Sequence, residues 1–98
     1  MAVIEIVKFH TKAGTDEAAF AALNERFQRE IAPQLPGLER REAAKGADGE
    51  WLLVLRYRDM ESAKRGPQLD RGMEVAGAFI SMIDMPTMSS THHTVMSE

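Results

Sequence analysis

The alternation of apolar and polar positions predicts four strands and two long helices. Val3, Val7 and Phe9 point to one side of an extended chain. Ile4 and Ile6 point to the other side, and apolar groups on both faces are typical of a central strand. The expected strands are residues 2–11, 37–45, 50–58 and 88–96. The expected helices are residues 15–32 and 67–84, with a short helical turn near residues 60–65.

The stretch "WLLVLRYRD" has the same two-sided character. One face carries Trp51, Leu53, Leu55 and Tyr57. The other face carries Leu52, Val54, Arg56 and Arg58. Both faces begin apolar and end in a group that can hydrogen-bond, so this strand is expected to be covered on both sides.

The first long helix is expected to begin at Thr15, a plausible N-cap, and to end near Pro33. Its apolar stripe has helical spacing and consists of Phe20, Leu23, Phe27 and Ile31. Asp59 is expected to cap the short turn that follows the third strand, and the Gly66-Pro67 pair is expected to break the chain before the second long helix. The stripe of that helix is Leu69, Met73, Ala76, Ile80 and Ile83, widened by Val75, Phe79 and Met82.

The segment "LERREAAK" has two readings. Its helix propensity is high, but it lies between a Pro-Gly pair and the turn "GADGE", directly before the third strand. A hairpin through that turn therefore fits better, with the charged strand at a sheet edge, where charge discourages unwanted pairing.

The resulting order, βαββαβ, predicts a single ferredoxin-like domain over residues 1–98 with an antiparallel four-stranded sheet. Both long helices cover one face of such a sheet, so the apolar residues of the other face need a second cover. We therefore expect a homodimer in which two sheets face each other and form a barrel-like core.

Three segments resemble the dimeric α+β barrel superfamily, and within it the antibiotic-biosynthesis monooxygenase-like domains: "PGLERRE", "WLLVLRYRD" and "MESAKRG". Many members of that family have tryptophan where Tyr57 stands and histidine near Gly66. The asparagine, tryptophan and histidine of the haem-degrading branch have no counterpart in "EIVKF" or "AKRGPQLDRGMEVAGA". The resemblance implies a homodimer that binds an apolar or aromatic small molecule and oxidises it without a cofactor.

The composition of the chain limits the classes of partner that it is expected to bind. Twelve Lys and Arg against fifteen Asp and Glu give a net charge of −3, which offers no electrostatic footprint for nucleic acid or an anionic membrane. The chain has no cysteine, which excludes disulfides and thiolate chemistry. No apolar run approaches the length of a membrane span, and the N-terminus lacks signal-peptide features, so a cytoplasmic protein is expected.

Tyr57 is the first candidate for a catalytic residue, because a phenol in an apolar site can donate a hydrogen bond to a carbonyl or an oxyanion. His10 is the second, as a general base at the polar end of a strand. Trp51 and Arg56 are candidate substrate-binding residues, although Trp51 also suits the core, and Arg56 also suits an ion pair with Glu39 or Glu42. A ligand pocket is expected between the sheet and the helices of one subunit, or in the barrel interior.

No metal site is expected. His92 and His93 are adjacent on a strand and face opposite ways, so at most one of them can join His10. Two functions stay open. One is a cofactor-independent monooxygenase, which would lose turnover in Tyr57→Phe and His10→Ala variants. The other is a non-catalytic ligand-binding, structural or stress-related dimer.

Overall fold

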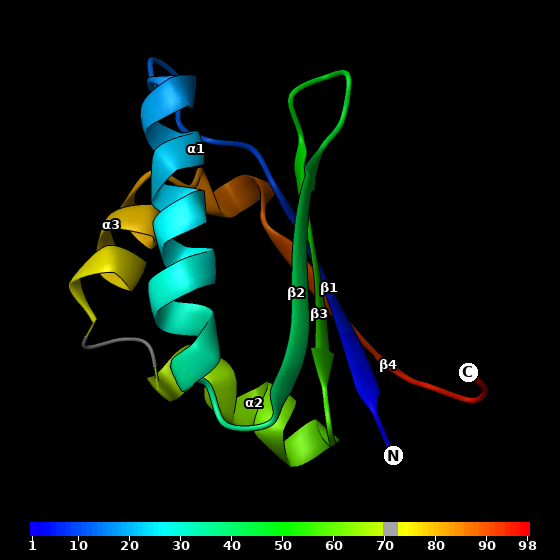
Figure 1. The fold of residues 1–98 in the computed structure, drawn as a ribbon. Helices are drawn as coiled ribbons and strands as arrows, with labels where there is room; N and C mark the ends of the chain where they lie inside the picture. Colours follow the sequence, from blue (N-terminus) through cyan, green and yellow to red (C-terminus); the bar gives the residue numbers. More distant parts are fainter. Residues whose placement is uncertain (70–72) are drawn as a thin grey trace.

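The computed structural model describes residues 1–69 and 73–98 (Figure 1). The strands are β1 (Val3–Phe9), β2 (Leu38–Lys45), β3 (Trp51–Tyr57) and β4 (Ser89–Thr94). The α-helices are α1 (Glu17–Arg26), α2 (Met60–Leu69) and α3 (Glu74–Ser81). A π-helical turn at Phe27–Ile31 and a 3-10 turn at Ala32–Gln34 extend α1, and a second 3-10 turn at Met85–Thr87 precedes β4.

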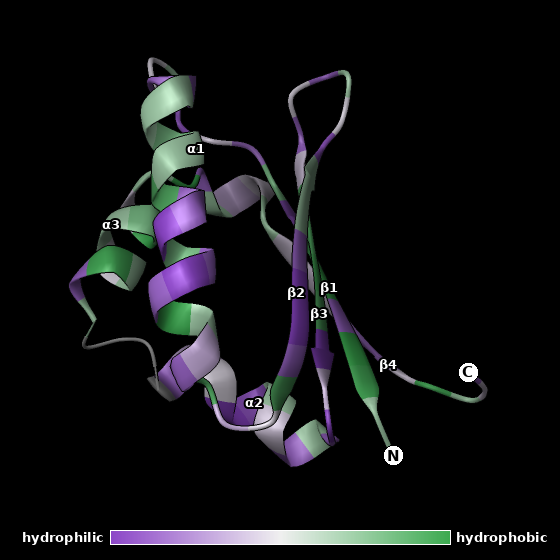
Figure 2. Ribbon diagram, in the orientation of Figure 1, coloured by the Kyte–Doolittle hydropathy of each residue, from purple (hydrophilic) through white to green (hydrophobic). Residues whose placement is uncertain are grey.

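The four strands form one antiparallel sheet in the order β2-β3-β1-β4, which confirms the predicted ferredoxin-like arrangement. β2 and β3 form the expected hairpin, closed where the Gly46 N–H donates to the carbonyl of Glu50 at 2.7 Å. β2 lies at an edge, and Figure 2 shows the hydrophilic residues along its middle. Figure 1 shows α1 and α3 on one face of the sheet, and no helix of the described residues lies on the other.

The core lies between the sheet and these helices. β3 turns Trp51, Leu53, Leu55 and Tyr57 toward the helices, and all four are buried. Phe9 and Phe20 are fully buried and meet edge to face, with their ring centroids 5.9 Å apart. Phe79 of α3 stacks on Phe20 at 4.8 Å and also meets Phe9, so the aromatic rings connect β1, α1 and α3. Such pairs add about 0.5–1.5 kcal/mol beyond the area they bury.

The opposite face of the sheet carries large apolar side chains without a helix above them. These are Ile4, Ile6, Leu52 and Val54, all partly exposed. They occupy the two central strands, where Ile6 is paired with Val54. The central strands therefore carry apolar side chains on both faces, as the sequence pattern predicted. In the single chain, the face opposite the helices is uncovered.

Two helix boundaries differ from the prediction. The N-cap of α1 is Asp16, whose side chain accepts a hydrogen bond from the Ala19 N–H at 3.1 Å, and not Thr15. The expected break at Gly66-Pro67 is also wrong, because α2 runs through both residues and contains Pro67.

The reason lies in the packing of α2. Ser62, Ala63 and Gly66 are buried on one side of it, at helical spacing, and the helix must continue through Gly66 to keep them on that side. The expected helix at residues 67–84 is thus divided between the end of α2 and α3, with residues 70–72 and the side chain of Leu69 outside the description. Asp59 does cap α2, since its carboxylate accepts from the Ser62 N–H at 2.8 Å.

No helix in the described part of the chain has the length and apolar character that crossing a bilayer requires.

Candidate functional site

A cavity of about 230 Å³ lies between the sheet and the helices of the single chain. Its sheet side is formed by Val7 of β1 and by Leu53 and Leu55 of β3. Its helix side is formed mainly by Phe27, Phe79, Ile80 and Ile83. The lining is mostly apolar, and four polar side chains interrupt it: Glu5, Arg41, Tyr57 and Ser90.

Arg41 enters the cavity from β2. Its guanidinium is held by two neutral side chains: Nη1 donates to Oε1 of Gln28 at 2.8 Å, and Nη2 donates to Oδ1 of Asn24 at 2.9 Å. The same group lies over the ring of Phe27, 4.7 Å from its centroid. Arg41 is only 5% exposed, so the charge is fixed in a dry, largely aromatic surrounding.

Burial lowers the pKa of Arg41 to about 10, although Glu25 and Tyr57 act in the opposite direction. At neutral pH the side chain therefore stays charged. No carboxylate among the described residues lies within ion-pair distance of it, whereas the exposed arginines 26 and 40 and the half-buried Arg56 all have such partners.

Glu5 reaches the cavity from β1. It is 6% exposed, accepts a hydrogen bond from the Ser90 hydroxyl at 2.8 Å, and has one oxygen 3.3 Å from Nε2 of His92. Both partners lie on the edge strand β4, and the side chain of His92 is 31% exposed. A buried carboxylate thus faces a mostly apolar cavity, and the imidazole of His92 connects it to solvent at the β4 edge of the sheet.

Strand register explains why these groups share one site. Leu55 is paired with Arg41 on one side and with Glu5 on the other, and Glu5 is in turn paired with His92. The four residues form one row across the sheet with their side chains on the helix side. Since neighbouring strands are about 4.8 Å apart, the backbones of Arg41 and Glu5 are separated by roughly 10 Å.

Tyr57 lies at the end of β3 and is 2% exposed. Its hydroxyl packs against α2 at Gly66, where an added Cβ would lie 2.6 Å from the Tyr57 oxygen. The predicted candidate therefore lines the cavity, and a residue without a side chain makes room for it.

The other three predicted site residues lie away from this cavity. Trp51 belongs to the aromatic core, stacked on Phe9 with centroids 6.3 Å apart. Arg56 lies on the open face of the sheet and pairs with Glu39 at 3.2 Å, the alternative that the sequence left open. The backbone of His10 bonds to residues that precede β4: its N–H donates to the Thr87 hydroxyl at 2.9 Å, and its carbonyl accepts from the Asp84 N–H.

The same register separates the histidines. His92 and His93 are paired with Glu5 and Ile4, near the start of β1, whereas His10 follows its end. The expected approach of His10 to this pair is therefore wrong. Within residues 1–69 and 73–98, no three His, Cys, Asp or Glu side chains are grouped in a way that would hold a metal ion.

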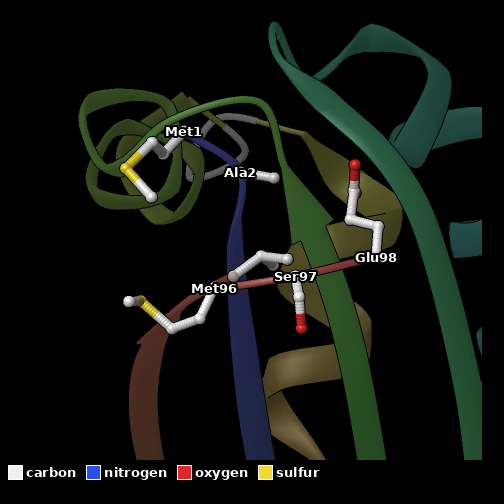
Figure 3. A pocket seen from close by; sticks show the side chains of 6 residues that line it. Met1, Ala2, Met96, Ser97 and Glu98 are labelled. Atoms are coloured by element: carbon white, nitrogen blue, oxygen red, sulfur yellow. The ribbon is translucent and has the colours of Figure 1, made fainter.

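A larger hollow, of about 420 Å³, lies between the two ends of the chain. It is lined by residues 1–2 and 95–98, and Met1 and Met96 are 78% and 83% exposed. Figure 3 shows the side chains of Met1 and Met96 extending to the left and that of Glu98 extending upward. Its lining consists of residues near the two chain ends, most of them exposed, so the smaller cavity is the better candidate for a site.

No family model and no curated protein matches the chain. Solved structures do. SnoaB from Streptomyces nogalater, "a cofactor-independent oxygenase", has a TM-score of 0.76 at 15% identity over 99% of this chain and 95% of its own. Rv0793 from Mycobacterium tuberculosis has a TM-score of 0.71 at 19% identity, covering 100% and 98%.

A third structure, a "Putative antibiotic biosynthesis monooxygenase" from Bordetella bronchiseptica, has a TM-score of 0.79 at 14% identity, with 98% of each chain covered. At these identities the likeness establishes the fold. The chain has the ferredoxin-like α+β fold of antibiotic-biosynthesis monooxygenase-like structures, as the three sequence segments predicted.

Proposed function

We propose that the cavity between the sheet and the helices binds a small aromatic molecule, and that the protein oxygenates it without a cofactor. The observation that supports this most directly is the set of polar groups on a mostly apolar lining, among them a carboxylate at Glu5, a guanidinium at Arg41 and a phenol at Tyr57. An apolar cavity with a few convergent polar groups is the usual form of a small-molecule site. The fold shared with a cofactor-independent oxygenase favours the same reaction class.

The proposed reaction begins at an acidic methylene group next to an aromatic ring and a carbonyl. A base takes one proton, and the carbanion transfers an electron to dioxygen. The resulting radicals combine to a peroxide. The protonated peroxide then loses water and leaves a second carbonyl, so one oxygen atom enters the product and the other leaves as water.

Two of these polar residues and the apolar lining each suit one task in this scheme. Glu5 is the base, since its carboxylate faces the cavity and His92 offers a path for the proton to the solvent side of β4. Tyr57 is a hydrogen-bond donor to the carbonyl of the substrate. The apolar lining keeps water away from the carbanion. This assignment keeps Tyr57 from the sequence candidates and replaces His10 by Glu5.

The proposed assembly is a homodimer formed by the open faces of two sheets. Ile4, Ile6, Leu52 and Val54 supply the apolar contact. The cavity lies on the other side of the sheet, so each subunit would hold its own site.

The test uses 2-tetralone, a two-ring ketone with such a methylene group, in chelator-treated buffer with ¹⁸O₂. We expect the protein to accelerate oxygen uptake and to place one labelled atom in the product. Glu5→Gln should lower the rate at saturating substrate by about 100-fold or more, the usual contribution of a general base.

His10→Ala serves as the control, because its side chain lies outside the cavity, and it should retain the rate. Full activity in Glu5→Gln would contradict the assignment of the base. If the compound binds and is not consumed, the non-catalytic binder that the sequence also allows becomes the better description.

A further inference from the structure

We infer that the ligand of this cavity carries an anionic oxygen that docks on Arg41, and that its ring system is no larger than about two fused rings. The inference rests on the proposed function, because it takes the cavity between sheet and helices as the site. It narrows the ligand to a compact aromatic carboxylate, phenolate or enolate.

The first support is the unbalanced charge of Arg41. A buried charge is strongly disfavoured unless a counter-charge or a ligand compensates it. Around Arg41 the acceptors are the amide oxygens of Asn24 and Gln28, and the rings of Phe27 and Phe79 lie near it. The carboxylate of Glu25 acts on the guanidinium only from beyond ion-pair distance. These groups position the guanidinium but do not neutralise it, so the described surroundings are complete only with an anion.

The second support is the donor geometry. A guanidinium has five N–H groups in a planar fork. Asn24 and Gln28 accept two of them, and no acceptor for the other three occurs among the described residues. Because Arg41 also lines the cavity, a ligand there can accept from the free part of the fork, a geometry that matches the two lone pairs of an oxyanion.

The third support is the position of Glu5, which fixes the orientation. Its carboxylate lies across the cavity from Arg41, with Leu55 between them in the row of paired residues. An anionic ligand is repelled from Glu5 and attracted to Arg41, so its charged end has one favourable direction. The end that faces Glu5 is then the one that offers a proton.

The size limit follows from the volume. A cavity of about 150 Å³ holds a benzene molecule, and drug-sized ligands occupy about 300–1,000 Å³. The cavity here measures about 230 Å³, between these two cases. It accommodates a substituted single ring or a fused pair of rings.

The test compares 2-naphthoate with 2-naphthamide, which has the same shape without the charge, by calorimetric titration at pH 7. We expect the carboxylate to bind roughly 10- to 100-fold more tightly, as charge-assisted bidentate hydrogen bonds do. Arg41→Met should remove this preference and leave the affinity for the amide unchanged. Arg41→Lys, which keeps the charge but not the fork, should retain part of the preference and covers the case in which the methionine variant does not fold.

Arg40→Met is the matched control. Arg40 is the neighbour of Arg41 on β2, points to the other face of the sheet, is exposed, and pairs with Glu42 at 2.9 Å. The Arg40→Met variant loses the same charge as Arg41→Met and should keep the preference for 2-naphthoate over 2-naphthamide. Equal affinities for the two probes in the natural protein would overturn the inference and leave the cavity as a site for neutral ligands. Failure of both probes to bind would overturn the proposed function as well.

Discussion

Glu5 and Arg41 are the residues of the candidate site that the sequence did not reveal. Glu5 is the easier of the two to identify from the sequence. It lies between Val3 and Val7 on the helix-facing side of a central strand, where a buried polar side chain is unusual. Arg41 lies in the charged run 39–42, in which no periodicity marks one residue as buried. Only the pairing of β2 with β3 places it beside Leu55 on the helix side.

At Gly66 the structure predicts an effect opposite to that of the usual helix substitution. Replacing a helical glycine by alanine ordinarily stabilises a protein by up to about 1 kcal/mol. At Gly66 the new Cβ would lie 2.6 Å from the Tyr57 hydroxyl and 3.3 Å from the ring carbon that bears it. We expect Gly66→Ala to lower the free energy of unfolding by about 1–3 kcal/mol in urea titrations, the range typical of overpacking.

Gly77 of α3 is the matched control for this substitution. It is also helical, but a Cβ there meets nothing within 4 Å, so Gly77→Ala should stabilise the protein. The double variant Gly66→Ala with Tyr57→Phe should regain stability, because the hydroxyl is the nearest obstacle. Equal stabilisation by Gly66→Ala and Gly77→Ala would contradict the described contact between α2 and β3.

For the helices and strands, the local sequence pattern was sufficient to predict an element where that pattern agreed with tertiary packing. The four strands lie within one or two residues of their expected bounds, and "LERREAAK" is the strand β2 in spite of its helix propensity. The turns on either side of this segment favoured the strand over a helix. In them, Gly37 and Gly49 adopt the positive φ angles of 81° and 88° that favour glycine. Such turn signals are local and can be read from the sequence.

The helices near Pro67 were mispredicted because the deciding contacts are distant in sequence. Propensity disfavours a proline inside a helix, yet α2 keeps its turn through Pro67 while Ala63 and Gly66 pack on the sheet. The cap of α1 was misplaced by one residue for a smaller reason. Thr15 and Asp16 are both good caps, and only the hydrogen bond to Ala19 distinguishes them.

At the scale of the whole molecule, the open face of the sheet predicts a dimer. Fully burying a large aliphatic side chain is worth about 1.5–3 kcal/mol, and Ile4, Ile6, Leu52 and Val54 are only partly covered in the single chain. We expect light scattering after size exclusion to give about twice the chain mass of 10.9 kDa at micromolar concentration. The melting temperature should rise with protein concentration, as it does when folding and association are linked.

The substitution Val54→Lys places a charge in the centre of this face and should shift the mass toward that of the single chain. Ala18→Lys adds the same charge on an exposed position of α1 and should leave the dimer intact. A mass near 10.9 kDa for the natural protein, with a melting temperature independent of concentration, would mean that the open face is not an interface.

We propose that the ligand binds between the sheet and the helices of one subunit and not in the barrel between two sheets. β3 provides a direct test, because it turns Leu53 and Leu55 to the helix side and Leu52 and Val54 to the open face. With methyl-labelled protein and bound 2-naphthoate, nuclear Overhauser effects report which methyl groups lie near the ring protons. We expect contacts with the methyl groups of Leu53 and Leu55. Contacts with those of Leu52 and Val54 instead would place the ligand on the open face and overturn the proposed site.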